Sequence, residues 1–333
     1  MKILVVGASG YLGGALARAW RDDGHEVAGV VRSDASAAKL RMDGLGIVRG
    51  DLRDPVGLAT AVTTATPDAV IVAASAGGGA GDTAAFTADR DAVQVLAAAL
   101  AGEGKTLVFT SGSAVFGVFA GGERADPAFT EDTALPLPRS VFARGIGDAD
   151  ARFAEDLEQA VGARIDAEAA TLRASGIRGM VVRPGNIYGY GGSIDVPKAI
   201  EIARANGVAP QWGSGQSLQG YVHLDDVVDL YRRVLLYGWP GGVYHAVAEE
   251  VSQHDLGRAI SRTIGAGDRT QNVTLTRMND LAGTRGVRLS LNKRLSAAAT
   301  SSALGWSPRR IGVLTEIEFG SYALYSRSLS NEP

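Results

Sequence analysis

The chain has 333 residues, of which 46% are apolar and 21% are charged, and its formal net charge is −3. This length allows one large core or two modest ones, and the small net charge argues against a nucleic-acid partner or a membrane-surface partner. Because the chain has no cysteine, disulfides and cysteine-based metal sites or nucleophiles are excluded.

The chain opens with an apolar run at 2–7 that glycines interrupt, too short for a signal peptide or a membrane span, so we expect a cytoplasmic protein. Similar short apolar runs, typical of strands covered on both faces, follow at 26–32, 68–74, 106–111 and 179–184. Stretches with helical spacing lie between them at 13–24, 54–66 and 88–104. This alternation predicts an α/β fold with a Rossmann-type, doubly wound parallel sheet.

Residues 118–158 interrupt the alternation with a Gly- and Pro-rich stretch followed by a charged, helix-like run. Structureless loops of this length are usually functional or disordered, and the functional alternative predicts a lid-like insertion that closes over an apolar ligand. We expect the dinucleotide-binding domain at 1–190, with the insertion inside it, and a smaller α/β substrate-binding region at 191–333. The lid residues expected to meet the ligand are Phe119, Phe129, Leu135 and Phe142.

The first apolar run leads into GASGYLG, in which Gly7, Gly10 and Gly13 are spaced as GxxGxxG. Glycines permit positive φ and let backbone N–H groups approach a pyrophosphate at the start of the following helix. An ordinary tight β-α turn is the alternative. The strand before the motif and the helix after it favour dinucleotide binding.

Cofactor preference is predicted from the end of the second apolar run. About 20 positions after the glycines, an acidic residue would bind the ribose hydroxyls of NAD, whereas an arginine can pair with the 2′-phosphate of NADP. Arg32 and Ser33 occupy this place, and Asp34 lies further along the loop. The sequence therefore predicts NADPH as the cofactor, with NADH as a weaker alternative.

The glycine spacing and several later motifs resemble those of the extended, epimerase/dehydratase-like branch of the short-chain dehydrogenase/reductase superfamily. The later motifs are GDLRD at 50–54, TSGSAVFG at 110–117, RPGNIYG at 183–189 and YVHLDDVVDLY at 221–231. The resemblance implies a nicotinamide cofactor, with Asp51 facing the adenine amine and Leu52 packing beside the ring. The residues expected to contact the cofactor are Gly7, Ser9, Gly10, Tyr11, Leu12, Gly13, Arg32, Ser33, Asp51, Leu52, Ala73, Ala74, Ser111, Pro184, Gly185 and Asn186.

In that family the helix before the RPxNxYG strand carries Tyr-x-x-x-Lys, often with a glutamate four residues after the lysine. When Glu168 is matched to that glutamate, Arg164 takes the place of the lysine and Ala160 the place of the tyrosine. The general acid is therefore missing, and no Tyr-x-x-x-Lys occurs elsewhere in the chain. Loss of positioned acid catalysis typically costs on the order of 10²–10⁴ in rate. The family's catalytic serine or threonine position is Gly112, which lies between Ser111 and Ser113.

Three functions are compatible with this pattern. The first is an NADPH-dependent ketoreductase of antibiotic biosynthesis, acting on a bulky aromatic polyketide whose phenol, next to the ketone, supplies the proton. The second is the same enzyme class with a substitute acid. The third is a non-catalytic dinucleotide sensor; epimerases and dehydratases are disfavoured because they depend on the same tyrosine. The candidates for the substitute acid are Ser111, Ser113, Tyr188 and Tyr190.

Several aromatic residues are candidate substrate contacts. Trp212 and Tyr221 lie in the variable region where family members line the substrate pocket, although core packing would explain these two at least as well. His223 lies in a structural signature of the family, and the other histidines are isolated, so no metal site is expected. The aromatic candidates are Tyr188, Tyr190, Trp212 and Tyr221.

Overall fold

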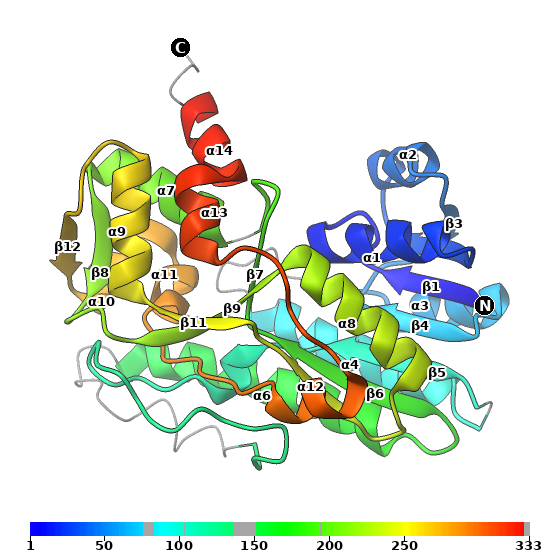
Figure 1. Cartoon of the computed structure of the whole chain (residues 1–333). Helices are drawn as coiled ribbons and strands as arrows, with labels where there is room; N and C mark the ends of the chain where they lie inside the picture. Colours follow the sequence, from blue (N-terminus) through cyan, green and yellow to red (C-terminus); the bar gives the residue numbers. More distant parts are fainter. Residues whose placement is uncertain (76–82, 103, 136–150, 194, 330–333) are drawn as a thin grey trace.

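The computed structural model describes residues 1–75, 83–102, 104–135, 151–193 and 195–329. Its centre is a parallel seven-stranded sheet with the order β10-β6-β5-β4-β1-β2-β3 (Figure 1). The strands are β1 (Lys2–Val6), β2 (Glu26–Val31), β3 (Gly46–Arg49), β4 (Ala69–Val72), β5 (Thr106–Thr110), β6 (Arg178–Pro184) and β10 (Val243–Ala246). The predicted Rossmann-type, doubly wound parallel sheet is therefore confirmed.

Helices cover both faces of this sheet (Figure 1). On one face, Leu16 and Trp20 of α1 pack against strand residues such as Val5, and α2 and α8 complete the layer. On the other face, Leu58 and Leu96 belong to the layer that α3, α4 and α6 form. The helices are α1 (Tyr11–Asp22), α2 (Asp34–Met42), α3 (Pro55–Ala65), α4 (Thr83–Ala99), α6 (Ala151–Arg173) and α8 (Leu224–Tyr237).

Side-chain caps explain where several of these helices begin. The Ser33 hydroxyl accepts a hydrogen bond from the backbone N–H of Ser36 at the start of α2. Asp54 caps α3 through Gly57, and His223 caps α8 through the N–H of Asp225. Each cap satisfies a backbone donor that has no partner within its helix.

Residues after β6 build a second lobe from two small sheets and short helices (Figure 1). β10 and α8 also come after residue 190, yet they join the large sheet and its helical layer. The strands of the lobe are β7 (Asn186–Tyr188), β8 (Ala209–Trp212), β9 (Leu218–His223), β11 (Glu249–Ser252) and β12 (Thr270–Val273). The remaining helices are α7 (Asp195–Asn206), α9 (Gln253–Thr263), α10 (Leu275–Ala282), α11 (Thr284–Leu289), α12 (Ala298–Leu304), α13 (Val313–Phe319) and α14 (Ser321–Leu329).

The described part of the predicted insertion consists of an irregular segment, 118–135, and the first turns of α6. The irregular segment lies against the chain that follows α11, where Val118 pairs with Asn292. Phe119, Phe129 and Leu135 belong to a hydrophobic cluster there. Phe142 lies outside the described residues, so the lid remains a prediction. No helix in the described parts of the chain is long and apolar enough to cross a membrane.

Candidate active site

A cavity of about 580 Å³ runs along the carboxyl ends of the central strands, including β1 and β4, where the strand order reverses. Ligands of doubly wound sheets bind at this switch point. Most residues predicted to contact the cofactor line the cavity, but Gly13 and Ser33 do not. The predicted residues that do line it are Gly7, Ser9, Gly10, Tyr11, Leu12, Arg32, Asp51, Leu52, Ala73, Ala74, Ser111, Pro184, Gly185 and Asn186.

The turn between β1 and α1 fits a pyrophosphate. Gly7 has a φ of +97°, and a Cβ atom at Gly13 would lie 2.3 Å from the carbonyl oxygen of Gly7. Gly13 therefore permits close contact between helix and turn. Gly10 caps α1 without a side chain, so the N–H groups of the first turn can face an anion.

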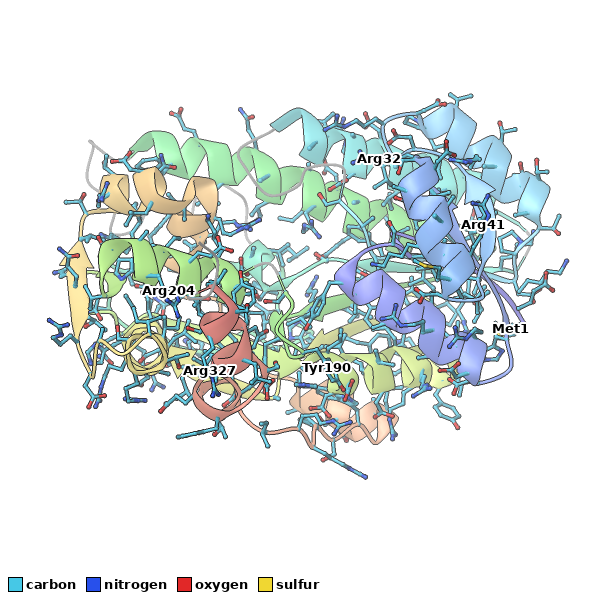
Figure 2. The ribbon with its side chains drawn as sticks, turned by 90° about the horizontal axis from the view of Figure 1, so that it is seen from above. Met1, Arg32, Arg41, Tyr190, Arg204 and Arg327 are labelled. Atoms are coloured by element: carbon cyan, nitrogen blue, oxygen red, sulfur yellow. The ribbon has the colours of Figure 1, made fainter. Side chains whose placement is uncertain are left out.

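At the other end of this cavity, Arg32 follows β2 and is exposed. Figure 2 shows Arg32 beside α2, and Ser36 of α2 also lines the cavity. Lys39, which the sequence pattern did not single out, donates a 2.7 Å hydrogen bond from Nζ to the carbonyl oxygen of Ser9. Lys39 therefore ties α2 to the glycine turn.

The orientation of α6 over the sheet is fixed by a buried ion pair. The Arg183 guanidinium contacts both oxygens of Glu168, with Nη2 2.6 Å from Oε2. Earlier on the same helix, Arg164 donates a 3.0 Å hydrogen bond from Nη1 to the carbonyl oxygen of Thr110. Ala160 and Arg164 line a second cavity, and Arg164 lines the first cavity as well.

The second cavity has a volume of about 190 Å³. It adjoins the first cavity at the RPGNIYG loop, whose residues Pro184, Gly185 and Asn186 line both. Ser111 lines both cavities; its buried hydroxyl has no hydrogen-bond partner among the described residues. Ser113 lines only the second cavity. The residues that line both cavities are Ser111, Arg164, Pro184, Gly185, Asn186 and Asp195.

Lys293 lines the second cavity, although the sequence pattern assigned it no role. Its Nζ donates a 3.1 Å hydrogen bond to Oδ1 of Asn186, whose Nδ2 donates a 2.7 Å bond to Gln219. The pKa of Lys293 is lowered to about 8, mainly by burial; Asp195 opposes the change and Arg288 adds to it. Lys293 lies outside the family motifs quoted above, and the one available signal was its rarity, since the chain has few lysines.

The second cavity is rich in positive charge. The basic residues among its described lining are Arg164, Arg285, Arg288 and Lys293, whereas Asp195 is acidic. Arg285 and Asp195 form a loose ion pair, with Nε 3.6 Å from Oδ1. This lining favours a ligand with negative charge.

The aromatic residues predicted to contact substrate lie outside the described lining of both cavities. The Tyr188 hydroxyl donates a 2.6 Å hydrogen bond to the carbonyl oxygen of Ile311. Tyr190 is exposed near the start of α8, where its hydroxyl donates to Asp225 (Figure 2). Trp212 packs edge-on against Phe119 in the hydrophobic cluster, and Tyr221 is buried.

Burial raises the pKa of Tyr188, and the nearby Glu249 carboxylate adds to this effect. His223 stacks edge-on against Tyr188 and Tyr190, outside the described lining of both cavities. Within the described ranges, no three His, Asp or Glu side chains gather in a way that could hold a metal ion.

The chain is similar in sequence to several known proteins. An uncharacterised protein of Saccharomyces cerevisiae is 27% identical over 329 residues, which cover 97% of this chain and all of the yeast protein. A 2-alkyl-3-oxoalkanoate reductase of Stenotrophomonas maltophilia is 45% identical over 62 residues, 19% of this chain and 18% of that enzyme.

Among solved structures, the dTDP-glucose 4,6-dehydratase DesIV of Streptomyces venezuelae, with NAD and TYD bound, has the same fold. The TM-score is 0.74 at 19% identity, over 100% of this chain and 99% of that one. The model of the NAD dependent epimerase/dehydratase family matches residues 3–145 and 163–246. Because these residues make up more than half of the chain, the protein belongs to the NAD dependent epimerase/dehydratase family, and its cofactor is a nicotinamide dinucleotide.

Proposed function

We propose that the protein is an NADPH-dependent reductase of a ketone. The observation that carries this proposal is the junction between the two cavities, where Ser111 and the Pro184–Asn186 loop belong to both walls. A dinucleotide in the larger cavity would place its reactive end at this junction. When bound, the reduced nicotinamide supplies a hydride to the carbonyl carbon.

The residues of the junction can serve the carbonyl oxygen and the cofactor. The Ser111 hydroxyl is buried and unpartnered among the described residues, so it can donate a hydrogen bond to a substrate carbonyl. Arg164 stays charged at every relevant pH, so it can hold the nicotinamide ribose but cannot release a proton near neutrality. Ala160 contributes no polar group, so the proton must come from elsewhere.

The size and charge of the second cavity support a small, acidic ketone as substrate. Its 190 Å³ is below the range of roughly 300–1,000 Å³ that is usual for drug-sized ligands. The lining of arginines and Lys293 would attract a carboxylate. The partial relative from Stenotrophomonas maltophilia, by its name, reduces a 2-alkyl-3-oxoalkanoate, which is a ketone that carries a carboxylate. The aromatic polyketide expected from the sequence is a bulkier alternative, and it stays a prediction.

The choice of NADPH over NADH is supported by the charges at the far end of the larger cavity. Arg32 lines this end, together with the Ser36 hydroxyl. Asp34 forms an exposed ion pair with Arg49 and is outside the described lining. A 2′-phosphate would therefore meet a cation and a hydroxyl.

The position of Ala160 in the cavity wall, where a catalytic tyrosine would be expected, favours a second candidate function: a dinucleotide sensor without catalysis. NADPH consumption distinguishes the two functions. The panel contains small 3-oxo acids, aromatic quinones with and without a phenol next to the ketone, and neutral ketones. Turnover of any member supports a reductase. The sensor is supported if the fluorescence of NADPH shows that it binds to the protein but no member of the panel leads to its oxidation.

A further inference from the structure

We propose that Lys293 is the proton donor of the reduction, with its Nζ protonating the carbonyl oxygen of the substrate. This inference rests on the proposed reductase function and names the acid that the chain uses without the family's tyrosine. None of the motifs quoted above contains this lysine, and the fold brings it to the second cavity.

The backbone around Lys293 is held firmly. Its N–H donates a 2.9 Å hydrogen bond to the carbonyl oxygen of Leu218, and its own carbonyl oxygen accepts a 3.2 Å bond from the N–H of Gly220. The residue is only 5% exposed and lines the second cavity. Lys293 is therefore a fixed feature of the cavity wall.

The ammonium group has donors left for a ligand. In the described parts of the chain, its one side-chain hydrogen bond is the 3.1 Å bond to Oδ1 of Asn186. An ammonium carries three N–H donors, so two remain for a group in the cavity. Because Asn186 lines both cavities and is itself held by Gln219, the ammonium lies next to the junction where hydride transfer would take place.

The other groups that could donate a proton are placed less favourably. The hydroxyls of Tyr188 and Tyr190 bind elsewhere and lie outside the described cavity walls. The serine hydroxyls at the junction can donate a hydrogen bond but are too weakly acidic to release a proton readily. Arginine guanidinium groups keep their protons. Lys293 is the one lysine in the described lining of the two cavities.

The electrostatic surroundings suit this role. Burial lowers the pKa of Lys293 to about 8, Arg288 on α11 acts in the same direction, and Asp195 on α7 opposes both. Arg285 on α11 and Arg164 on α6 also face this cavity. An acid works best when its pKa lies near the working pH, and this lysine meets that condition without a tyrosine.

The reaction balances with a single proton from the protein. The carbonyl carbon gains a hydride from the reduced dinucleotide, which is thereby oxidised by two electrons. The π electrons of the carbonyl bond form the new O–H bond with the proton that leaves Nζ. The neutral amine then regains a proton from water.

The test compares Lys293→Arg and Lys293→Met with Lys198→Met, which removes a partly exposed lysine that pairs with Glu201 on α7, away from the described walls of both cavities. Arginine keeps the positive charge but cannot release a proton near neutrality. We therefore expect both Lys293 variants to lose about 10²–10⁴ in kcat, with NADPH affinity and thermal stability preserved in Lys293→Arg. Lys198→Met should keep full activity. Activity of Lys293→Arg within tenfold of the unmodified protein would overturn the proposal.

A second measurement needs neither cofactor nor substrate. The chain has five lysines, Lys2, Lys39, Lys105, Lys198 and Lys293, so ¹³C labelling at Cε gives a short set of resonances. The resonance missing from Lys293→Arg should titrate with a pKa of about 8, against about 10.4 for an ordinary lysine.

A third measurement uses the substrate that the panel identifies. The kcat of the unmodified protein should fall as the pH rises above this pKa, because the ammonium group then loses the proton that it donates.

The outcomes separate the two proposals. If the unmodified protein oxidises NADPH with none of the panel, the reductase function and the proton donor both fail. If it reduces a ketone while Lys293 titrates with the other lysines, the reductase function stands and the proton donor fails.

Discussion

Glu168 and Arg183 form a buried ion pair in which the guanidinium of β6 contacts both carboxylate oxygens of α6, at distances of 2.6 to 3.1 Å. Both side chains are almost fully buried. Arg164 and Ala160 lie about one and two turns before Glu168 on the same helix. The pair therefore fixes which residues of α6 face the second cavity.

Removing one partner of this pair should destabilise the protein strongly. Glu168→Gln leaves the Arg183 charge buried without a counter-ion, which typically costs about 3–5 kcal/mol. Replacing both residues with leucine should recover most of this loss, because no charge is then left unpaired. Urea denaturation of the cofactor-free protein measures both effects. A single variant that loses less than about 1 kcal/mol would contradict this account.

Gly13→Ala should weaken cofactor binding by at least tenfold, about 1.4 kcal/mol. The new Cβ atom would lie 2.3 Å from the carbonyl oxygen of Gly7, so the turn or the helix must shift. Gly162→Ala is the matched control, because a Cβ atom there meets no atom within 4 Å. The control should bind NADPH normally and gain up to about 1 kcal/mol in stability. Fluorescence titration with NADPH gives both affinities, and equal affinities would show that the turn tolerates a side chain.

Arg32→Asp should lower the preference for NADPH over NADH by at least tenfold, because the carboxylate repels a 2′-phosphate and can bind ribose hydroxyls. Arg41→Asp makes the same change in net charge at the exposed end of α2 and should leave the preference unaltered. Titrations with both dinucleotides at constant ionic strength provide the comparison. Tighter binding of NADH by the unmodified protein would refute the assignment.

Stability should fall as the solution is acidified below about pH 6.5. Burial lowers the pKa of His245, whose Nδ1 lies 3.0 Å from the carbonyl oxygen of Ser296, and burial also lowers that of His223. In the unfolded chain these histidines have an ordinary pKa of about 6.5. Below that pH the unfolded chain therefore binds protons that the folded protein does not accept.

Each of these histidines contributes its full stabilisation above that pH. The stabilisation is lost as the pH falls toward the pKa of that histidine in the folded protein, with a slope of at most about 1.4 kcal/mol per pH unit. His245→Gln should reduce the slope. Urea denaturation between pH 5 and 7.5 measures it, and equal slopes in the unmodified protein and the variant would disprove the assignment.

The large sheet could be predicted because its central strands are short, apolar on both faces and separated by amphipathic helices. β1, β2, β4 and β5 fall within predicted runs, and β6 begins one residue before its predicted run. β3 and β10 were missed because each strand has only four residues and does not form an apolar run. β3 contains Arg49, and β10 contains His245. Their place in the sheet depends on partners far away in the chain.

The lining of the larger cavity was largely predictable because the motifs that form it are local and follow strands in sequence. The residues that line the second cavity were not predictable in this way. Tyr188, Tyr190, Trp212 and Tyr221 lie near the right motifs, but their side chains pack or hydrogen-bond elsewhere. Lys293 reaches Asn186 through a contact between residues more than a hundred positions apart, which no spacing rule indicates.

The pairing of β10 with β6 also determines how the protein unfolds. Val243 pairs with Val181, so the chain leaves the large sheet, builds most of the second lobe and returns to complete the edge of the sheet. A fragment that ended at residue 190 would expose β6 as a bare edge, which invites aggregation. Because the strand that completes the sheet follows most of the second lobe in the chain, we expect the two lobes to unfold together, and calorimetry should record a single peak of heat absorption.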